Sequence, residues 1–200
     1  MKLIPKALIF LRLFIGILIL IFSLLKIDNY KVIAIVLFAV GLLSDIFDGI
    51  IARQLKISTQ NLRRLDSTID QVFFVLIVIA TFIESHQFFY NNKIELIILL
   101  ATEGLTYLVC FIKFKKEIAT HSITSKIWTL ILFATLIQVI ATGNSVILFQ
   151  FCFYIGMITR LEIIGIILLL RTWTNDVPGI YQAVLLRQGK PIKRNKLFNG

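Results

Sequence analysis

The chain has 200 residues and a formal net charge of +10; 58% of its residues are hydrophobic and 16% are charged. Soluble domains average about 45–50% apolar and about 25% charged residues, so this composition excludes an ordinary soluble domain and indicates a membrane protein. The positive charge does not predict nucleic-acid binding, because no recognition motif accompanies it.

Six segments are apolar enough to cross a bilayer, whose hydrocarbon core needs about 20 helical residues. In chain order they are Ala7–Leu25, Val32–Ala52, Leu62–Ile83, Ile94–Phe114, Ile127–Thr142 and Val146–Arg171. No small-residue cleavage pattern follows the first segment, so we interpret it as a retained helix rather than a signal peptide. The sequence therefore predicts an all-α, polytopic protein whose six transmembrane helices form one domain over residues 1–171.

The connections between these segments alternate in charge. Basic residues gather in the N-terminus, in Arg53–Asn61, in Lys113–Lys126 and in the tail. The opposite connections, Lys26–Lys31, Glu84–Lys93 and Gly143–Ser145, hold only three of the 21 Lys and Arg residues. Because basic loops stay in the cytoplasm, we expect both termini and the polar cavity of the bundle to face the cytoplasm, in an inner or plasma membrane.

Residues 172–200 change in character and predict a cytoplasmic extension. Asn175 or Asp176 could cap a short helix that has Pro178 in its first turn and Gly189 as its stop. One apolar face of this helix would consist of Ile180, Tyr181, Val184 and Leu185. Basic residues follow it, so we interpret the segment as an interfacial helix and a basic tail on anionic membrane lipids.

Four aspartates lie inside the predicted membrane helices, where ionisable groups are costly and usually functional. Asp45 and Asp48 are at the cytoplasmic end of the second helix, and Asp66 and Asp70 are at the cytoplasmic start of the third. Residues three or four apart share a helix face. Consecutive membrane helices are antiparallel, so we expect the four carboxylates to meet at one membrane depth.

Such a cluster needs a cation, because like charges cannot share a low-dielectric site unneutralised. Oxygen ligands favour Mg²⁺, Mn²⁺ or Ca²⁺ over zinc, and such an ion suits a phosphate or pyrophosphate ligand. Arg53 offers a further cation to a phosphate. Gly49 and Ala52 would let a ligand approach the helix backbone, or they could simply pack two helices together.

The segment from Asp45 to Asp70 resembles the signature of the CDP-alcohol phosphatidyltransferases, D-x2-D-G-x2-A-R-x8-G-x3-D-x3-D, at seven of its eight fixed positions. The exception is Leu62, where the signature has glycine. The resemblance implies that CMP is displaced from CDP-diacylglycerol, or a related CDP-lipid, by the hydroxyl of a small alcohol. Glycerol 3-phosphate, inositol phosphate, inositol and serine all remain possible acceptors. The resemblance also implies a homodimer.

The resemblance assigns roles to the matched residues. Asp45, Asp48 and Asp66 would hold one or two Mg²⁺ or Mn²⁺ ions on the CDP pyrophosphate. Asp70, a further metal ligand, would take the proton from the attacking hydroxyl. The nucleotide site would be lined by Gly49, Ala52 and Arg53.

Three basic residues outside the signature are further candidates. Arg12 resembles an arginine found near the start of many family members, although it could instead snorkel to the cytoplasmic face. Lys126 and Arg160 could bind an acceptor phosphate, although Lys126 could merely follow the positive-inside bias. Arg160 lies roughly 16 Å along the helix from Arg171, too deep for snorkelling, which predicts a function or a buried ion pair. Glu162 is a poor partner for Arg160 because the two differ by two positions.

Two other functions remain open. In a divalent-cation transporter the aspartates would be ion ligands, but all four lie at the cytoplasmic side of their helices. A catalytically silent family member that binds lipid is the other alternative, and Leu62 is the residue that suggests it. Release of CMP from CDP-diacylglycerol would distinguish the three.

Overall fold

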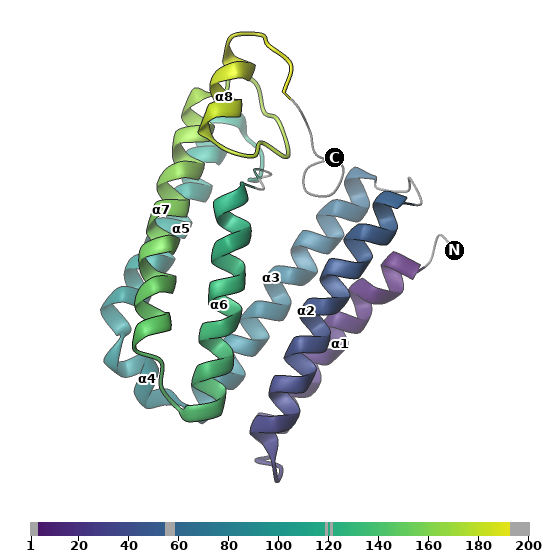
Figure 1. The fold of residues 1–200 in the computed structure, drawn as a ribbon, viewed down its shortest axis with the longest axis vertical. Helices are drawn as coiled ribbons and strands as arrows, with labels where there is room; N and C mark the ends of the chain where they lie inside the picture. Colours follow the sequence, from purple (N-terminus) through teal and green to yellow (C-terminus); the bar gives the residue numbers. More distant parts are fainter. Residues whose placement is uncertain (1–3, 55–58, 119, 121, 193–200) are drawn as a thin grey trace. The chain divides into compact units, whose positions relative to one another are not determined.

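The protein is described from a computed structural model and consists of helices joined by short connections (Figure 1). The structure describes residues 4–54, 59–118, 120 and 122–192, without the side chains of residues 4, 52–54, 60, 61 and 63. The helices are α1 (Ile4–Leu24), α2 (Tyr30–Gln54), α3 (Gln60–Glu84), α4 (His86–Asn91), α5 (Lys93–Phe114), α6 (Ile123–Thr142), α7 (Ile147–Leu169) and α8 (Ile180–Arg187). These described residues contain no strand.

Six of the helices, α1, α2, α3, α5, α6 and α7, are long and apolar enough to cross a membrane. The prediction of an all-α protein with six membrane helices is therefore confirmed. The start of α6 differs from the prediction, since the helix begins at Ile123 rather than Ile127. The Ser122 hydroxyl accepts a hydrogen bond from the backbone N–H of Ser125 at 3.2 Å, and this cap stabilises the additional turn. The short helix α4 was not predicted.

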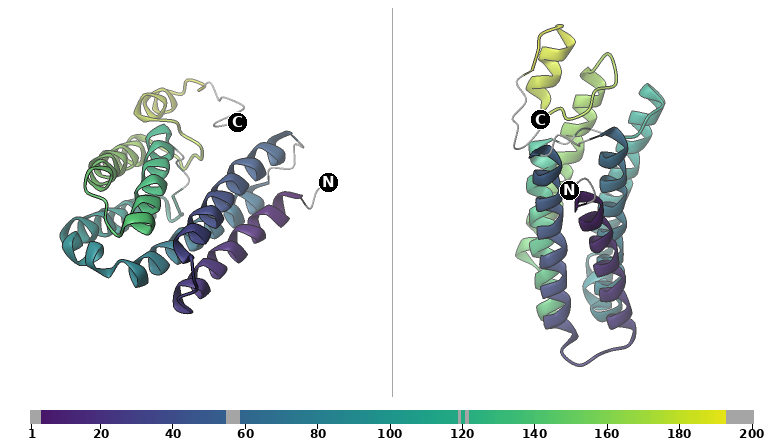
Figure 2. Two further views of the ribbon diagram at one scale, coloured as in Figure 1. Left: turned by 60° about the horizontal axis from the view of Figure 1, so that its bottom comes forward. Right: turned by 90° about the vertical axis from the view of Figure 1, so that its right-hand side faces the viewer.

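The chain forms two compact units, one of Met1–Tyr90 with Leu136–Asn144 and the other of Asn91–Thr135 with Ser145–Gly200. In the first unit, α1 packs against both α2 and α3 (Figure 1). In the second unit, α5 packs against α7, and α7 packs against α8 (Figure 2). The predicted aspartate site belongs to the first unit, while Lys126 and Arg160 belong to the second.

An aromatic side chain fixes the packing of the first unit. Phe73 of α3 is 1% exposed, and its ring centroid lies 5.7 Å from that of Phe38 on α2. Gly41 makes this approach possible, because a Cβ at that position would lie 2.4 Å from the Phe73 ring. Phe73 is one turn after Asp70 and Gly41 is one turn before Asp45. The contact therefore sets the distance between the helix turns that carry the aspartates.

The short helix after α7 begins later than predicted. Its N-cap is Gly179, which makes no side-chain capping bond, so neither Asn175 nor Asp176 caps it and Pro178 precedes the helix. Asp176 has a left-handed backbone (φ 54°), whereas an N-cap residue adopts an extended conformation. The helix end agrees with the prediction, since Gly189, just beyond it, has a φ of 76°.

The side of α8 that packs against the protein also differs from the predicted apolar face. The core that α8 forms with α7 and the connection between them consists of Ile166, Leu170, Val177 and Ala183. Ile180 and Tyr181, which the sequence placed on the apolar face, are 44% and 69% exposed. The predicted apolar face is therefore only partly exposed, since Val184 and Leu185 are half-buried, and its contact with a membrane stays a prediction.

Candidate functional site

The four predicted aspartates lie in helix turns at one end of the first unit. Asp45 and Asp48 are in the last turns of α2, and Asp66 and Asp70 are in the first turns of α3. One carboxylate oxygen from each of Asp45, Asp48 and Asp66 lies within 4.8 Å of the other two. Asp48 is buried, while the side chains of the other three are about one third exposed. The structure thus brings the carboxylates together and leaves three of the four partly exposed.

Arg12 of α1 lies among these carboxylates and is 1% exposed, so it does not snorkel. Its Nη1 atom is 3.1 Å from Asp45 Oδ1 and 3.2 Å from Asp66 Oδ1. The same guanidinium forms ion pairs with Asp48 through Nη2 and with Asp70 through Nη1. One positive charge facing four negative charges leaves a formal charge of −3 in this group.

The donor atoms of this cluster fit a hard divalent cation. All of them are carboxylate oxygens, the ligands preferred by Mg²⁺, Mn²⁺ and Ca²⁺. Such ions bind oxygen at about 2.0–2.6 Å, so two ligands on opposite sides of one ion are about 4–5 Å apart. The oxygens of Asp45, Asp48 and Asp66 lie within 4.8 Å of one another, which agrees with this spacing. Asp70 is not in that group of three, but it forms an ion pair with Arg12, which also contacts the other three aspartates.

The remaining signature residues adjoin the cluster along the chain. Gly49 follows Asp48 in α2 and is half-buried, whereas the side chains of Ala52 and Arg53 lie outside the described residues. Leu62, at the signature glycine position, is in the first turn of α3 and is half-buried. Its backbone N–H donates to the Thr59 hydroxyl at 3.2 Å, so this residue belongs to the capped start of the helix.

A second buried arginine lies in the other unit. Arg160 of α7 is 6% exposed, and its Nη2 atom is 2.6 Å from Glu103 Oε2 on α5. Its Cζ atom is 3.7 Å from the centre of the Trp128 ring on α6. Trp128 donates from Nε1 to the Cys152 carbonyl at 3.0 Å, and a Cβ at Gly156 would come within 2.7 Å of Nε1. Arg160 thus forms the kind of buried ion pair that the sequence allowed, held against an aromatic face.

Glu162 and Lys126 occupy different positions in the same unit. The Thr124 hydroxyl donates to Glu162, which agrees with the expectation that Glu162 is a poor partner for Arg160. Lys126 is half-buried in the first turn of α6. It is two positions from Trp128, so the two side chains leave the helix on different sides.

The sequence interpretation missed the contacts of Arg12 with all four aspartates. One signal was available, because Arg12 is the single charged residue in the apolar segment Ala7–Leu25. A lone charge in a membrane helix needs a partner, and the aspartates of the next two helices are the first acidic residues after it that lie inside a predicted membrane helix. Trp128, the aromatic partner of Arg160, gave no comparable signal.

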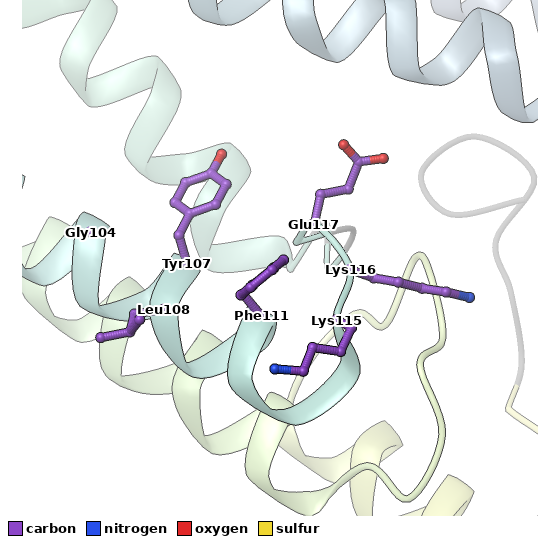
Figure 3. A pocket seen from close by; sticks show the side chains of 7 residues that line it. All are labelled: Gly104, Tyr107, Leu108, Phe111, Lys115, Lys116 and Glu117. Carbon is purple, nitrogen blue, oxygen red and sulfur yellow. The ribbon is translucent and has the colours of Figure 1, made fainter.

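One pocket is lined by residues of α5 and of the connection that follows it (Figure 3). Its lining consists of Gly104, Tyr107, Leu108, Phe111, Lys115, Lys116 and Glu117. Figure 3 shows aromatic and aliphatic side chains along the helix, with the charged side chains at its C-terminal end. None of the predicted site residues lines this pocket, and its acidic group is the single Glu117. The carboxylate cluster, rather than this pocket, is therefore the candidate catalytic centre.

Residues 2–175 match the family model described as CDP-alcohol phosphatidyltransferase. The match includes Arg12, the four aspartates and the Arg160–Glu103 pair. No curated protein and no solved structure matches the chain.

Proposed function

The chain belongs to the CDP-alcohol phosphatidyltransferase family, and we propose that it transfers a phosphatidyl group from CDP-diacylglycerol to a small alcohol in a metal-dependent reaction that releases CMP. Family membership makes it a transferase of substituted phosphate groups that acts in phospholipid synthesis. Its six apolar helices make it an integral, multi-pass membrane protein. The observation that supports the proposal most strongly is the convergence of the four aspartates.

The proposed metal ligands are Asp45, Asp48 and Asp66, whose oxygens have a suitable spacing for Mg²⁺ or Mn²⁺. A divalent ion bound there would neutralise charge on the CDP pyrophosphate and on the leaving CMP. Asp70 completes the metal-binding group. Gly49, Ala52 and Arg53 would line the nucleotide site next to Asp48.

The reaction itself needs a base for the acceptor. In the proposed step the acceptor oxygen forms a bond to the phosphatidyl phosphorus, and the bond from that phosphorus to CMP breaks. Asp70 takes the proton from the acceptor hydroxyl. It is suited to this role because its side chain is 31% exposed, so an incoming alcohol can reach it.

The proposed acceptor class is a phosphorylated alcohol of the glycerol 3-phosphate or inositol phosphate type. Arg160 supports this choice, because a guanidinium presents a planar fork of donors to a phosphate. Glu103 and Trp128 hold that fork in place, and its buried Nε has no hydrogen-bond partner among the described residues. Lys126 is the second proposed phosphate-binding residue.

The proposed orientation places both termini and the aspartate site in the cytoplasm, at the side of the basic connections. Labels at the two ends should both be protected from a membrane-impermeant reagent added outside intact cells. Modification of either end would overturn the orientation. The homodimer, the cytoplasm-facing cavity and the division into residues 1–171 and 172–200 stay predictions.

The decisive experiment measures CMP release from CDP-diacylglycerol by the purified full-length protein in lipid nanodiscs. We expect release that depends on Mg²⁺ or Mn²⁺, stops with a chelator, and requires glycerol 3-phosphate or inositol phosphate rather than inositol or serine. Asp66→Asn should abolish it. Full activity with chelator would overturn the metal role. Absence of CMP release with every acceptor would instead favour the silent or transporter alternative, and an ion-flux assay in vesicles separates these two.

A further inference from the structure

The charge balance around Arg12 differs from that of an ordinary buried ion pair. Its Nη1 atom contacts Asp45, Asp66 and Asp70, and its Nη2 atom contacts Asp48. A guanidinium has five N–H donors and a single charge. It therefore contacts an oxygen of each of the four carboxylates, but its single positive charge balances only one of their four negative charges.

Arg12 contacts carboxylates that the proposed metal would also bind. Three of its four partners, Asp45, Asp48 and Asp66, are the residues whose oxygens lie within 4.8 Å of one another. Because the guanidinium contacts one oxygen of each of these carboxylates, an ion held by the same three residues would be close to it, and two cations so close in a site of low dielectric repel strongly. The guanidinium and the ion therefore compete for the same carboxylates.

The buried position of Arg12 strengthens this argument. Its side chain is 1% exposed, and its Nε atom has no hydrogen-bond partner among the described residues. Each contact that holds the guanidinium is thus made by its two terminal nitrogens, at the end of a flexible stem. Displacement of the guanidinium therefore requires rotation about the bonds of that stem rather than a change in the α1 backbone.

We propose that Arg12 is a tethered counter-ion that a divalent cation displaces from the four aspartates when it binds. The guanidinium keeps the carboxylates together and partly neutralised before the ion arrives, and it lowers the affinity of the site for the ion. The family assignment supports a divalent ion at the aspartates, but it does not imply that this ion replaces a guanidinium there. The inference rests on the proposed metal role of the aspartates.

The test measures Mn²⁺ binding to the full-length protein in nanodiscs by electron paramagnetic resonance, without any lipid substrate. Arg12→Met keeps an unbranched side chain and removes the charge. Because hydrogen bonds to charged groups contribute about 1.5–3 kcal/mol, we expect Arg12→Met to bind Mn²⁺ about 10- to 100-fold more tightly than the unaltered protein. Lys31→Met removes a positive charge from the far end of α2 and should leave the affinity unchanged.

Thermal unfolding gives a second readout that does not depend on activity. In chelator, Arg12→Met should melt at a lower temperature than the unaltered protein, because the four carboxylates then lose the cation that contacts all of them. Saturating Mn²⁺ should shrink this difference, since both proteins then have the same neutralising ion. A difference that persists unchanged in Mn²⁺ would show that Arg12 remains in place when the ion binds, and would overturn the exchange.

The possible failures can be told apart. If neither protein binds Mn²⁺, the proposed metal role fails, and the exchange fails with it. If both bind with equal affinity, or Arg12→Met binds more weakly, the metal role stands and the exchange alone is wrong. Should Arg12→Met not fold, Arg12→Lys serves instead, because an ammonium reaches fewer of the carboxylates at once. Its Mn²⁺ affinity is expected to exceed that of the unaltered protein, and an equal affinity would overturn the proposal.

Discussion

Among the residues that the structure describes, each of the two units buries one arginine, but the units surround it differently. Arg12 contacts four carboxylates, whereas Arg160 contacts one carboxylate, Glu103, and the face of Trp128. The first group has a formal charge of −3, and the second is neutral. A partly exposed group with such an excess of negative charge can bind a further cation. The Arg160–Glu103 pair is neutral and does not need a further cation. The N–H groups of Arg160 that Glu103 does not contact could instead bind a neutral or anionic ligand.

This difference suggests that the CDP-lipid donor and the alcohol acceptor of the proposed reaction bind at two different kinds of site. The carboxylate-rich group suits a metal and the pyrophosphate that accompanies it. The balanced group suits the acceptor phosphate, because Glu103 and Trp128 can hold the guanidinium without blocking its Nε. Substitutions should therefore affect the donor and acceptor sides of the reaction separately.

The largest effect is expected from Asp70→Asn, which keeps the shape of the side chain but removes the proposed base. Turnover should fall about 10²- to 10⁴-fold, with CDP-lipid binding mostly retained. Steady-state CMP release and equilibrium binding of CDP-diacylglycerol measure the two quantities. The matched control is Asp28→Asn, because Asp28 is exposed and lies in the connection between α1 and α2. Normal turnover of Asp70→Asn would remove Asp70 from the base role.

Arg160→Met should act on the acceptor alone. Loss of a charged hydrogen bond to the acceptor phosphate should raise the acceptor KM about 10- to 100-fold, because such bonds contribute about 1.5–3 kcal/mol. The CDP-lipid KM and the Mn²⁺ affinity should not change. Arg160→Lys retains the charge but not the planar fork, so an intermediate KM is expected. A lowered melting temperature with an unchanged acceptor KM would make Arg160 purely structural.

Gly41→Ala should destabilise the unit that carries the aspartates. The new Cβ would lie 2.4 Å from the Phe73 ring, and such overpacking costs about 1–3 kcal/mol. Gly104→Ala in the other unit is the control, because nothing lies within 4 Å of its added Cβ. It should be neutral or stabilising, since alanine favours a helix by up to about 1 kcal/mol over glycine. Denaturant unfolding in detergent compares the two, and equal stability changes would contradict the packing argument.

Leu62→Gly should have the smallest effect. Leu62 is in the capped first turn of α3, so glycine should lower the free energy of unfolding by about 1 kcal/mol or less. CDP-lipid binding should stay the same, and Leu62→Ala should cost less stability than glycine. Tighter CDP-lipid binding by Leu62→Gly would show instead that the leucine narrows the nucleotide site.

The membrane helices were predictable because the length of an apolar run is a strong signal. The short helix His86–Asn91 was missed because six residues cannot show a clear helical period. The start of α8 was missed because Asn175 and Asp176 have the side chains of N-cap residues, but Asp176 is left-handed. Composition thus indicated a side-chain cap, whereas the helix begins after Gly179, which makes no such bond.

The meeting of the four aspartates followed from their spacing on two consecutive helices. Their contact with Arg12 did not, because it requires knowing that α1 packs against both α2 and α3. The partners of Arg160 were equally hidden, since Glu103 and Trp128 lie on different helices far from it in sequence. The sequence periodicity shows which residues share one face of a helix. Which other helix packs against that face depends on the tertiary structure.

Arg12 precedes all four aspartates along the chain, so it is synthesised and enters the membrane first. Insertion of a charged residue at the centre of a membrane helix costs about 2.5–3.5 kcal/mol. When α2 follows, Asp45 and Asp48 meet a cation that is already in place, and α3 then brings Asp66 and Asp70 to the same partner. Reversed order would insert four carboxylates before any counter-ion. We therefore expect α1 to present the positive charge against which the carboxylates of α2 and α3 pack as these helices insert.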